Sequence, residues 1–174
     1  MNSPATLGPL GSALVTTFGL GHLRPASGTW GSLPPVILAA ALIALGMGPA
    51  DHPILFNTTL GAVLVIFTLA CAAWGNQAEA RFGKKDPGQV VADETAGQCI
   101  PLLFLPADSV ATWPSAAITL ALAFLAFRAF DILQLWPAHQ IQRLSGGWGI
   151  VLDDLVAGLQ TMILIQILAR VLFT

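Results

Sequence analysis

Runs of apolar residues dominate this chain, and their lengths limit the folds that it can adopt. Segments 55–75 and 155–173 are each long enough for a helix across a bilayer, which needs about 20 apolar residues. Residues 114–130 just reach that length, and residues 33–48 form a shorter uninterrupted run. Only 9% of the 174 residues are charged, against about 25% in a typical soluble domain. The sequence therefore predicts a helical membrane protein.

The apolar segment 95–106 is the weakest candidate for a further crossing. It is too short unless it extends to about residue 112, and Pro101 would kink a helix there. Two topologies stay open: five crossings, or four full spans with residues 95–106 re-entrant. In either case we expect an all-α integral-membrane bundle of about four to five hydrophobic helices. Because no change in composition divides the chain, residues 1–174 are expected to form one domain.

Positive charge is distributed unevenly between the predicted loops. With five crossings, residues 1–32, 76–94 and 131–154 share one side of the membrane, and the other side holds only Arg170. Cytoplasmic loops are enriched in lysine and arginine, so the positively charged side is expected to face the cytoplasm. Its cations are Arg24, Arg81, Lys84, Lys85, Arg128 and Arg143. The net charge of −2 gives no indication of a nucleic-acid partner.

Two of these three segments, 76–94 and 131–154, carry acidic residues close to the ends of apolar runs: Asp93, Glu94, Asp131, Asp153 and Asp154. Capping of helix N-termini is the structural alternative, but it explains a pair of neighbouring acids poorly, and Asp131 follows its apolar run. Arg128 and Asp131 are three residues apart and can pair on one helix face. Carboxylates that converge from separate segments suit a hard cation such as Mg²⁺ or Mn²⁺. We expect these five acids to include the metal ligands.

A glycine-rich stretch, "FGLGHLRPASGTWGSL" (18–33), offers contacts for a phosphate group. Glycine lets backbone N–H groups approach an anion, hydroxyls add donors, and an arginine can bind phosphate through two hydrogen bonds. A flexible turn before a helix is the alternative interpretation. The predicted substrate contacts are Arg24, Gly28, Thr29, Gly31, Ser32 and Arg128. Acids and an anion cradle together indicate a metal-dependent enzyme that acts on a phosphorylated group at the cytoplasmic membrane surface.

Four sequence motifs occur in a fixed order. They read "FGLG…SGTWGSL", "DPGQVVADETAG", "FRAFDILQLWP" and "GGWGIVLDDLVAG", and they cover residues 18–33 and 84–158. Together they resemble the pattern of the phosphatidylglycerophosphatase A family. The chain departs from that pattern in two places. Ser27 stands where the family usually has proline, and Gln134 with Leu135 replaces a usual Lys-Pro pair, which bears on substrate preference.

This resemblance implies a membrane-associated, Mg²⁺-dependent phosphatase of phospholipid biosynthesis. Its substrate would be phosphatidylglycerophosphate, and its products phosphatidylglycerol and inorganic phosphate. It would be a multi-pass protein of the bacterial cytoplasmic (inner) membrane, with the active site facing the cytoplasm. The catalytic residues would be Asp93, Glu94, Asp153 and Asp154. The resemblance indicates a phospholipid and a membrane as partners, and neither a nucleic acid nor a protein.

Two other classes of protein stay open as alternatives. A CDP-alcohol phosphotransferase also uses clustered aspartates and Mg²⁺ in a membrane, but it would need a D-G-x2-A-R motif and differently spaced later aspartates, which "DDLVAG" (153–158) does not supply. A small cation-coupled transporter would place its acids near the middle of its helices. Here the acids are predicted at helix ends on one side, which favours chemistry at the membrane surface.

Overall fold

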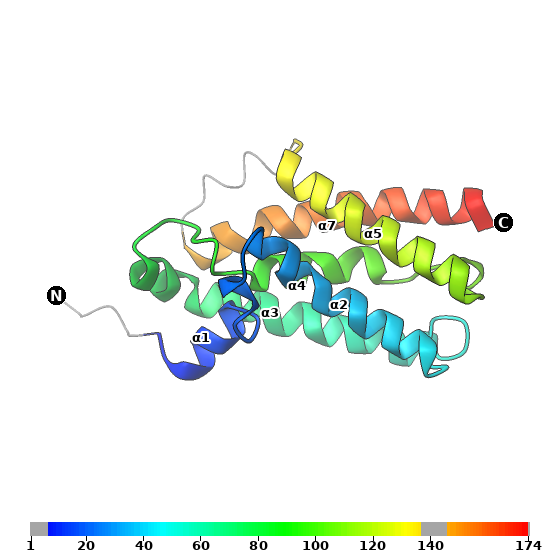
Figure 1. Cartoon of the computed structure of the whole chain (residues 1–174), viewed down its shortest axis with the longest axis horizontal. Coiled ribbons are helices and arrows are strands. Elements are labelled where there is room, and N and C mark those ends of the chain that lie inside the picture. Colours follow the sequence, from blue (N-terminus) through cyan, green and yellow to red (C-terminus); the bar gives the residue numbers. More distant parts are fainter. Residues whose placement is uncertain (1–6, 137–145, 174) are drawn as a thin grey trace.

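Four long helices form the frame of the molecule (Figure 1). The computed structural model describes residues 7–136 and 146–173, and its regular elements in those ranges are all helical. Each long helix is long and apolar enough to span a membrane. They are α2 (Ser27–Ala44), α3 (Pro53–Phe82), α5 (Trp113–Leu133) and α7 (Gly147–Phe173). The predicted all-α bundle with membrane-length helices is therefore confirmed.

The segment between α3 and α5 passes through the bundle as short helices. They are α4 (Ala92–Cys99), η2 (Ile100–Leu102) and η3 (Ala107–Val110). Figure 1 shows α4 among the long helices. Residues 95–102 are buried, so protein and not lipid surrounds these short helices. The segment ends at the far side, where Val110 and Trp113 line a cleft with Ala44 and Asp51.

Because residues 95–112 pass from one end of the bundle to the other, the loop after α3 and the end of α5 lie at the same end. Lys85 and Asp86 of that loop share a cleft with Gly149 and Asp153 of α7, and Gln134 shares a crevice with Asp153. This is the side arrangement predicted for five crossings. We call it the site end of the bundle. It also carries α1 (Pro9–Val15) and η1 (Leu20–His22).

Two of the long helices begin earlier in the chain than their apolar runs. α2 starts at Ser27 instead of near residue 33, and α7 starts at Gly147 instead of near residue 155. The glycine-rich motif is therefore partly the first turns of α2, and "GGWG" (146–149) opens α7. Hydropathy detects only the part of a helix that lies in apolar surroundings, so the polar turns at the site end were not predicted as helix.

α2 contains two prolines, and α4 supplies the hydrogen bond that one of them, Pro35, removes from the helix. Pro35 has no N–H group, so the carbonyl of Gly31 lacks its usual partner four residues later. The hydroxyl of Thr95 donates to this carbonyl at 2.8 Å. A Cβ on Gly31 would lie 2.6 Å from the Cβ of Val91, so the two helices meet at van der Waals limits there. The hydrogen bond and the close contact thus fix the position of α4 along α2.

Glycines also set the distance of α7 from its neighbours. Gly147 packs against Cys71 and Ala72 of α3, and Gly75 packs against Gly147 in return. Gly97 of α4 and Gly158 of α7 face each other in the same manner. Small residues at such crossings let helix backbones approach closely, which is how helices in membranes commonly associate. The two cysteines, Cys71 and Cys99, are buried and free.

Candidate active site

Three carboxylates from two helices meet inside the site end of the bundle. Asp93 and Glu94 lie in the first turn of α4, and Asp154 lies in the second turn of α7. One ligand oxygen from each lies within 4.8 Å of the other two. Asp93 and Asp154 are almost completely buried, with 6% and 4% of their surface exposed. We call Asp93, Glu94 and Asp154 the carboxylate triad.

Each member of the triad keeps a buried oxygen that no protein donor reaches. These atoms are Asp93 Oδ1, Glu94 Oε2 and Asp154 Oδ2. Burial raises the pKa of Asp93 well above its ordinary value, and the nearby charge of Glu94 raises it further. Burial also raises the pKa of Glu94, to about 7, although Asp93 and Arg128 partly oppose that effect. Ionised carboxylates that are buried without donors require a cation, so the triad has the donor set of a divalent-metal site.

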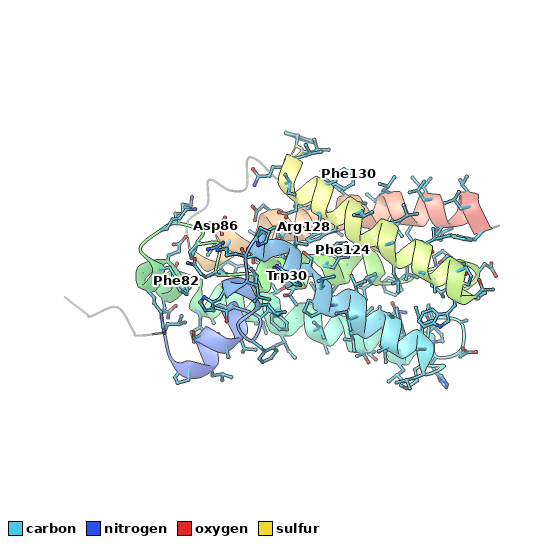
Figure 2. All side chains as sticks on the ribbon, in the orientation of Figure 1. Trp30, Phe82, Asp86, Phe124, Arg128 and Phe130 are labelled. Carbon is cyan, nitrogen blue, oxygen red and sulfur yellow. The ribbon has the colours of Figure 1, made fainter. Side chains whose placement is uncertain are left out.

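An arginine, Arg128, lies at the site end of the bundle (Figure 2), where it neighbours Glu94 of the triad across Gly28. The Arg128 guanidinium donates to Asp131 over 2.6 Å between Nη1 and Oδ2, as their spacing on α5 predicted. It also reaches the hydroxyl of Ser32 at 3.4 Å. Gly28 leaves room for this arrangement, because a Cβ there would overlap Glu94 Oε1 and lie 2.8 Å from Arg128 Nη2. Gly28, Ser32 and Arg128 are therefore brought together next to Glu94.

The remaining two predicted metal ligands flank the triad without belonging to it. Asp131 is bound to Arg128 and lines a crevice with Asp153 and Asp154. Asp153 directly precedes Asp154 on α7, so its side chain leaves the helix axis about 100° away from that of Asp154. It lines a cleft of about 200 Å³ with Lys85 and Asp86. Helix capping does not account for Asp153 or Asp154, since α7 begins six residues before the first of them.

The other predicted phosphate contacts occupy different surroundings. Thr29 is half-buried in the first turn of α2, and its N–H bonds the Ala26 carbonyl. Gly31 packs against Val91 as described above, which gives it a role in helix packing. Arg24 is exposed, with Gly88 as its neighbour. Of the predicted cytoplasmic cations, Arg143 lies outside the described residues.

Two polar residues at the site were not among the predicted ones. Asp86 opens the motif "DPGQVVADETAG", so its position there was the available signal; Figure 2 shows it at the site end of the bundle, as it shows Arg128. Gln98 lies one helical turn after Glu94 and is completely buried, and neither atom of its amide has a hydrogen-bond partner. Nothing in the sequence distinguished Gln98 from a residue on a polar helix face.

Comparison of the sequence with known proteins identifies its family. The profile of the family described as "Phosphatidylglycerophosphatase A" matches residues 13–169. A Bacteroides thetaiotaomicron protein named as a candidate phosphatidylinositol-3-phosphatase is 36% identical over 152 residues, which cover 87% of this chain and 89% of that protein. A Haemophilus influenzae phosphatidylglycerophosphatase A is 34% identical, covering 87% and 84%. The Escherichia coli phosphatidylglycerophosphatase A is 29% identical, covering 67% and 76%. No solved structure matches the chain.

Proposed function

Because the chain belongs to the phosphatidylglycerophosphatase A family, we propose that it hydrolyses phosphatidylglycerophosphate to phosphatidylglycerol and inorganic phosphate. The reaction breaks the bond between phosphorus and the glycerol oxygen. The oxygen of water forms the new bond to phosphorus, and the released alcohol takes up a proton. The family membership does not favour the alternatives of a CDP-alcohol phosphotransferase or a cation-coupled transporter.

The observation that carries this proposal is the carboxylate triad with its three unpaired buried oxygens. Asp93, Glu94 and Asp154 would hold a Mg²⁺ ion, for which carboxylate oxygens are the preferred protein ligands. Asp131 and Asp153 stay proposed as further ligands from the positions that flank the triad. When bound, the cation would supply positive charge to offset the phosphate and would make a water molecule more acidic. The proposed catalytic residues are Asp93, Glu94, Asp153 and Asp154.

The groups around Arg128 are suited to hold the phosphate opposite the acids. Arg128 is oriented by Asp131 and keeps further guanidinium donors for a phosphate oxygen. The first turn of α2, with Gly28 and Thr29, presents the positive end of a helix dipole, which favours anions. Ser32 adds a hydroxyl beside Arg128. Gly31 and Arg24 stay proposed as weaker contributors, given their surroundings.

The charge distribution supports an orientation with the site end in the cytoplasm. Among the described residues, Arg24, Arg81, Lys84, Lys85 and Arg128 lie towards this end, whereas Arg170 lies near the other end of α7. This is the asymmetry of a cytoplasmic face, and we propose the bacterial inner membrane as the location. Cysteines substituted at Lys85 and Arg143 should both be labelled from the cytoplasmic side. Labelling from opposite sides would refute this topology.

The decisive experiment measures phosphate release by the purified full-length protein in detergent micelles. The substrates are phosphatidylglycerophosphate, phosphatidylinositol 3-phosphate and phosphatidic acid, each with Mg²⁺ and with excess EDTA. We expect Mg²⁺-dependent release that is fastest from phosphatidylglycerophosphate. Preference for phosphatidylinositol 3-phosphate would instead assign the activity named for the Bacteroides relative. Equal rates in EDTA would exclude the metal site.

A further inference from the structure

A cleft of about 200 Å³ opens beside the carboxylate triad and has no role in the proposal above. Its walls come from the loop after α3 and from the first two turns of α7, and its lining residues are Lys85, Asp86, Gly149, Ile150 and Asp153. Asp153 also lines the crevice that contains Asp154. The cleft therefore neighbours the triad through two consecutive residues of α7, Asp153 and Asp154.

The cleft is lined by both hydrogen-bond donors and hydrogen-bond acceptors. The Lys85 ammonium can only donate hydrogen bonds, and the carboxylates of Asp86 and Asp153 can only accept them when ionised. One cation against two acids leaves the lining with a negative balance, which disfavours a phosphate group there. The ammonium disfavours a second metal ion, and the charged lining disfavours an acyl chain. A group with several hydroxyls suits the cleft, because each hydroxyl both donates and accepts.

The position of the cleft relates it to the alcohol part of a substrate. If a phosphate group lies between the triad and Arg128, the alcohol bound to that phosphate must extend out past one of the neighbouring side chains. The route past Asp153 leads into the cleft between Lys85 and Asp86. The lining of that route has hydrogen-bonding groups for hydroxyls next to the bond that is hydrolysed.

We propose that this cleft binds the hydroxyl-bearing alcohol that carries the phosphate, and that Lys85 and Asp86 thereby select lipids with a polyol headgroup. This inference rests on the proposed phosphatase function. The selected class comprises phosphate monoesters of glycerol-type or inositol-type headgroups. Phosphatidic acid, whose phosphate is attached to diacylglycerol with no intervening polyol, leaves the cleft without a ligand group and is a poor substrate.

The test compares two neighbouring lysines. Lys85→Met removes the donor in the cleft, and Lys84→Met, outside the lining, is the matched control. On phosphatidylglycerophosphate and phosphatidylinositol 3-phosphate we expect Lys85→Met to lower kcat/KM about tenfold, which is the loss of one hydrogen bond to a charged group. On phosphatidic acid we expect both variants to stay near the wild-type rate. Asp86→Asn, which suits the positive φ of that residue, should lower the same preference.

An equal fall on all three lipids would overturn the proposal, because it would assign Lys85 to the phosphate or to folding. An unchanged preference in Lys85→Met would overturn it as well. A binding measurement keeps this test separate from the proposed function: calorimetric titration of the full-length protein with glycerol 1-phosphate and with inorganic phosphate. Lys85→Met should weaken only the glycerol 1-phosphate. Wild-type protein that binds glycerol 1-phosphate no better than inorganic phosphate contradicts the cleft assignment, whereas absence of lipid hydrolysis contradicts only the phosphatase.

Discussion

Gly97 of α4 lies against the main-chain carbonyl of Asp154 on α7, so closely that a Cβ at residue 97 would stand 2.7 Å from that oxygen. The ring of Phe127 closes the same space at 2.8 Å. This contact brings the turn of α4 that carries Asp93 and Glu94 next to the turn of α7 that carries Asp154. The carboxylate triad therefore depends on a residue that has no side chain.

Substitution Gly97→Ala should separate α4 from α7 and weaken metal binding. The added methyl group has no free space, and overpacking of this kind costs about 1–3 kcal/mol. We expect a lower unfolding temperature and a Mg²⁺ affinity reduced by about tenfold or more, measured by thermal unfolding against Mg²⁺ concentration. Gly61→Ala is the control, because a Cβ in the middle of α3 meets nothing within 4 Å there. A normal Mg²⁺ affinity in Gly97→Ala would show that the crossing does not position the triad.

Substitution Asp93→Asn should have opposite effects with and without metal. In the metal-free protein it replaces a carboxyl group whose ionised form is disfavoured by burial and by the neighbouring acids, so the unfolding temperature in EDTA should rise. With Mg²⁺ it removes a ligand, so the stabilisation on adding Mg²⁺ should fall by most of its wild-type value. Lipid phosphate hydrolysis should decrease by orders of magnitude. A variant that loses stability in EDTA as well would indicate that Asp93 has a structural role.

The sequence predicted the long helices because their apolar stretches are continuous, as in residues 55–75 of α3. It did not predict that α2 begins at Ser27, ahead of Pro34 and Pro35. A proline in the interior of a helix removes a hydrogen bond, and the compensation for Pro35 comes from Thr95, which is distant in sequence. The passage of α4, η2 and η3 through the bundle was only weakly indicated by the sequence. A helix in contact with lipid needs about 20 apolar residues, but a segment buried inside protein does not, so its apolar run can be shorter.

The candidate site was predictable as a set of residues but not as a geometry. The i, i+3 spacing of Arg128 and Asp131 gave their ion pair directly, since both lie on one helix. Which acids meet depends on the face that each helix turns towards its neighbours. The side chains of Asp153 and Asp154 point in directions about 100° apart around the axis of α7. Gly31 illustrates the opposite case: a residue predicted to bind phosphate lies where two helices pack.

Arg128→Lys should impair the enzyme more than Arg24→Lys. Arg128 is oriented by Asp131 and borders Glu94 through the space above Gly28, whereas Arg24 is exposed. Lysine keeps the charge but loses the planar guanidinium, which can bind one phosphate through two hydrogen bonds. Steady-state kinetics on phosphatidylglycerophosphate should show a substantially raised KM or lowered kcat for Arg128→Lys alone. The reverse order would move the phosphate towards the start of α2.

Gln98→Met should raise the unfolding temperature of the metal-free protein. The amide of Gln98 is completely buried with both polar atoms unpaired, and each such atom costs about 1–3 kcal/mol. Methionine has a similar length and no amide, so it fills the space without that cost. Thermal unfolding in EDTA measures the gain, and Gln77→Met on α3, which is only half-buried, serves as the control. A lower unfolding temperature for Gln98→Met would mean that the amide is satisfied by a bound group.

The raised pKa of Glu94 predicts that pH acts in opposite directions on the metal-free and the metal-bound protein. Burial holds this pKa at about 7 instead of the ordinary 4.5, so the folded metal-free protein binds a proton that the unfolded chain releases between these values. Stability without metal should therefore be highest below about pH 4.5 as far as Glu94 is concerned, and should decrease as pH rises through 7. Mg²⁺ binding requires the ionised carboxylate, so it should strengthen over the same range.

Thermal unfolding at pH values from 5 to 8, in EDTA and in Mg²⁺, measures both effects in one series. We expect the unfolding temperature in EDTA to fall with pH and the increment from Mg²⁺ to grow. Glu94→Gln cannot titrate at this position, so its unfolding temperature in EDTA should vary less with pH than that of the wild type. The unfolding temperature of Glu94→Gln should still vary somewhat with pH, because the pKa of Asp93 is raised as well. A wild-type protein that becomes more stable in EDTA from pH 5 to pH 8 would show that Glu94 is ionised in the folded state without a cation.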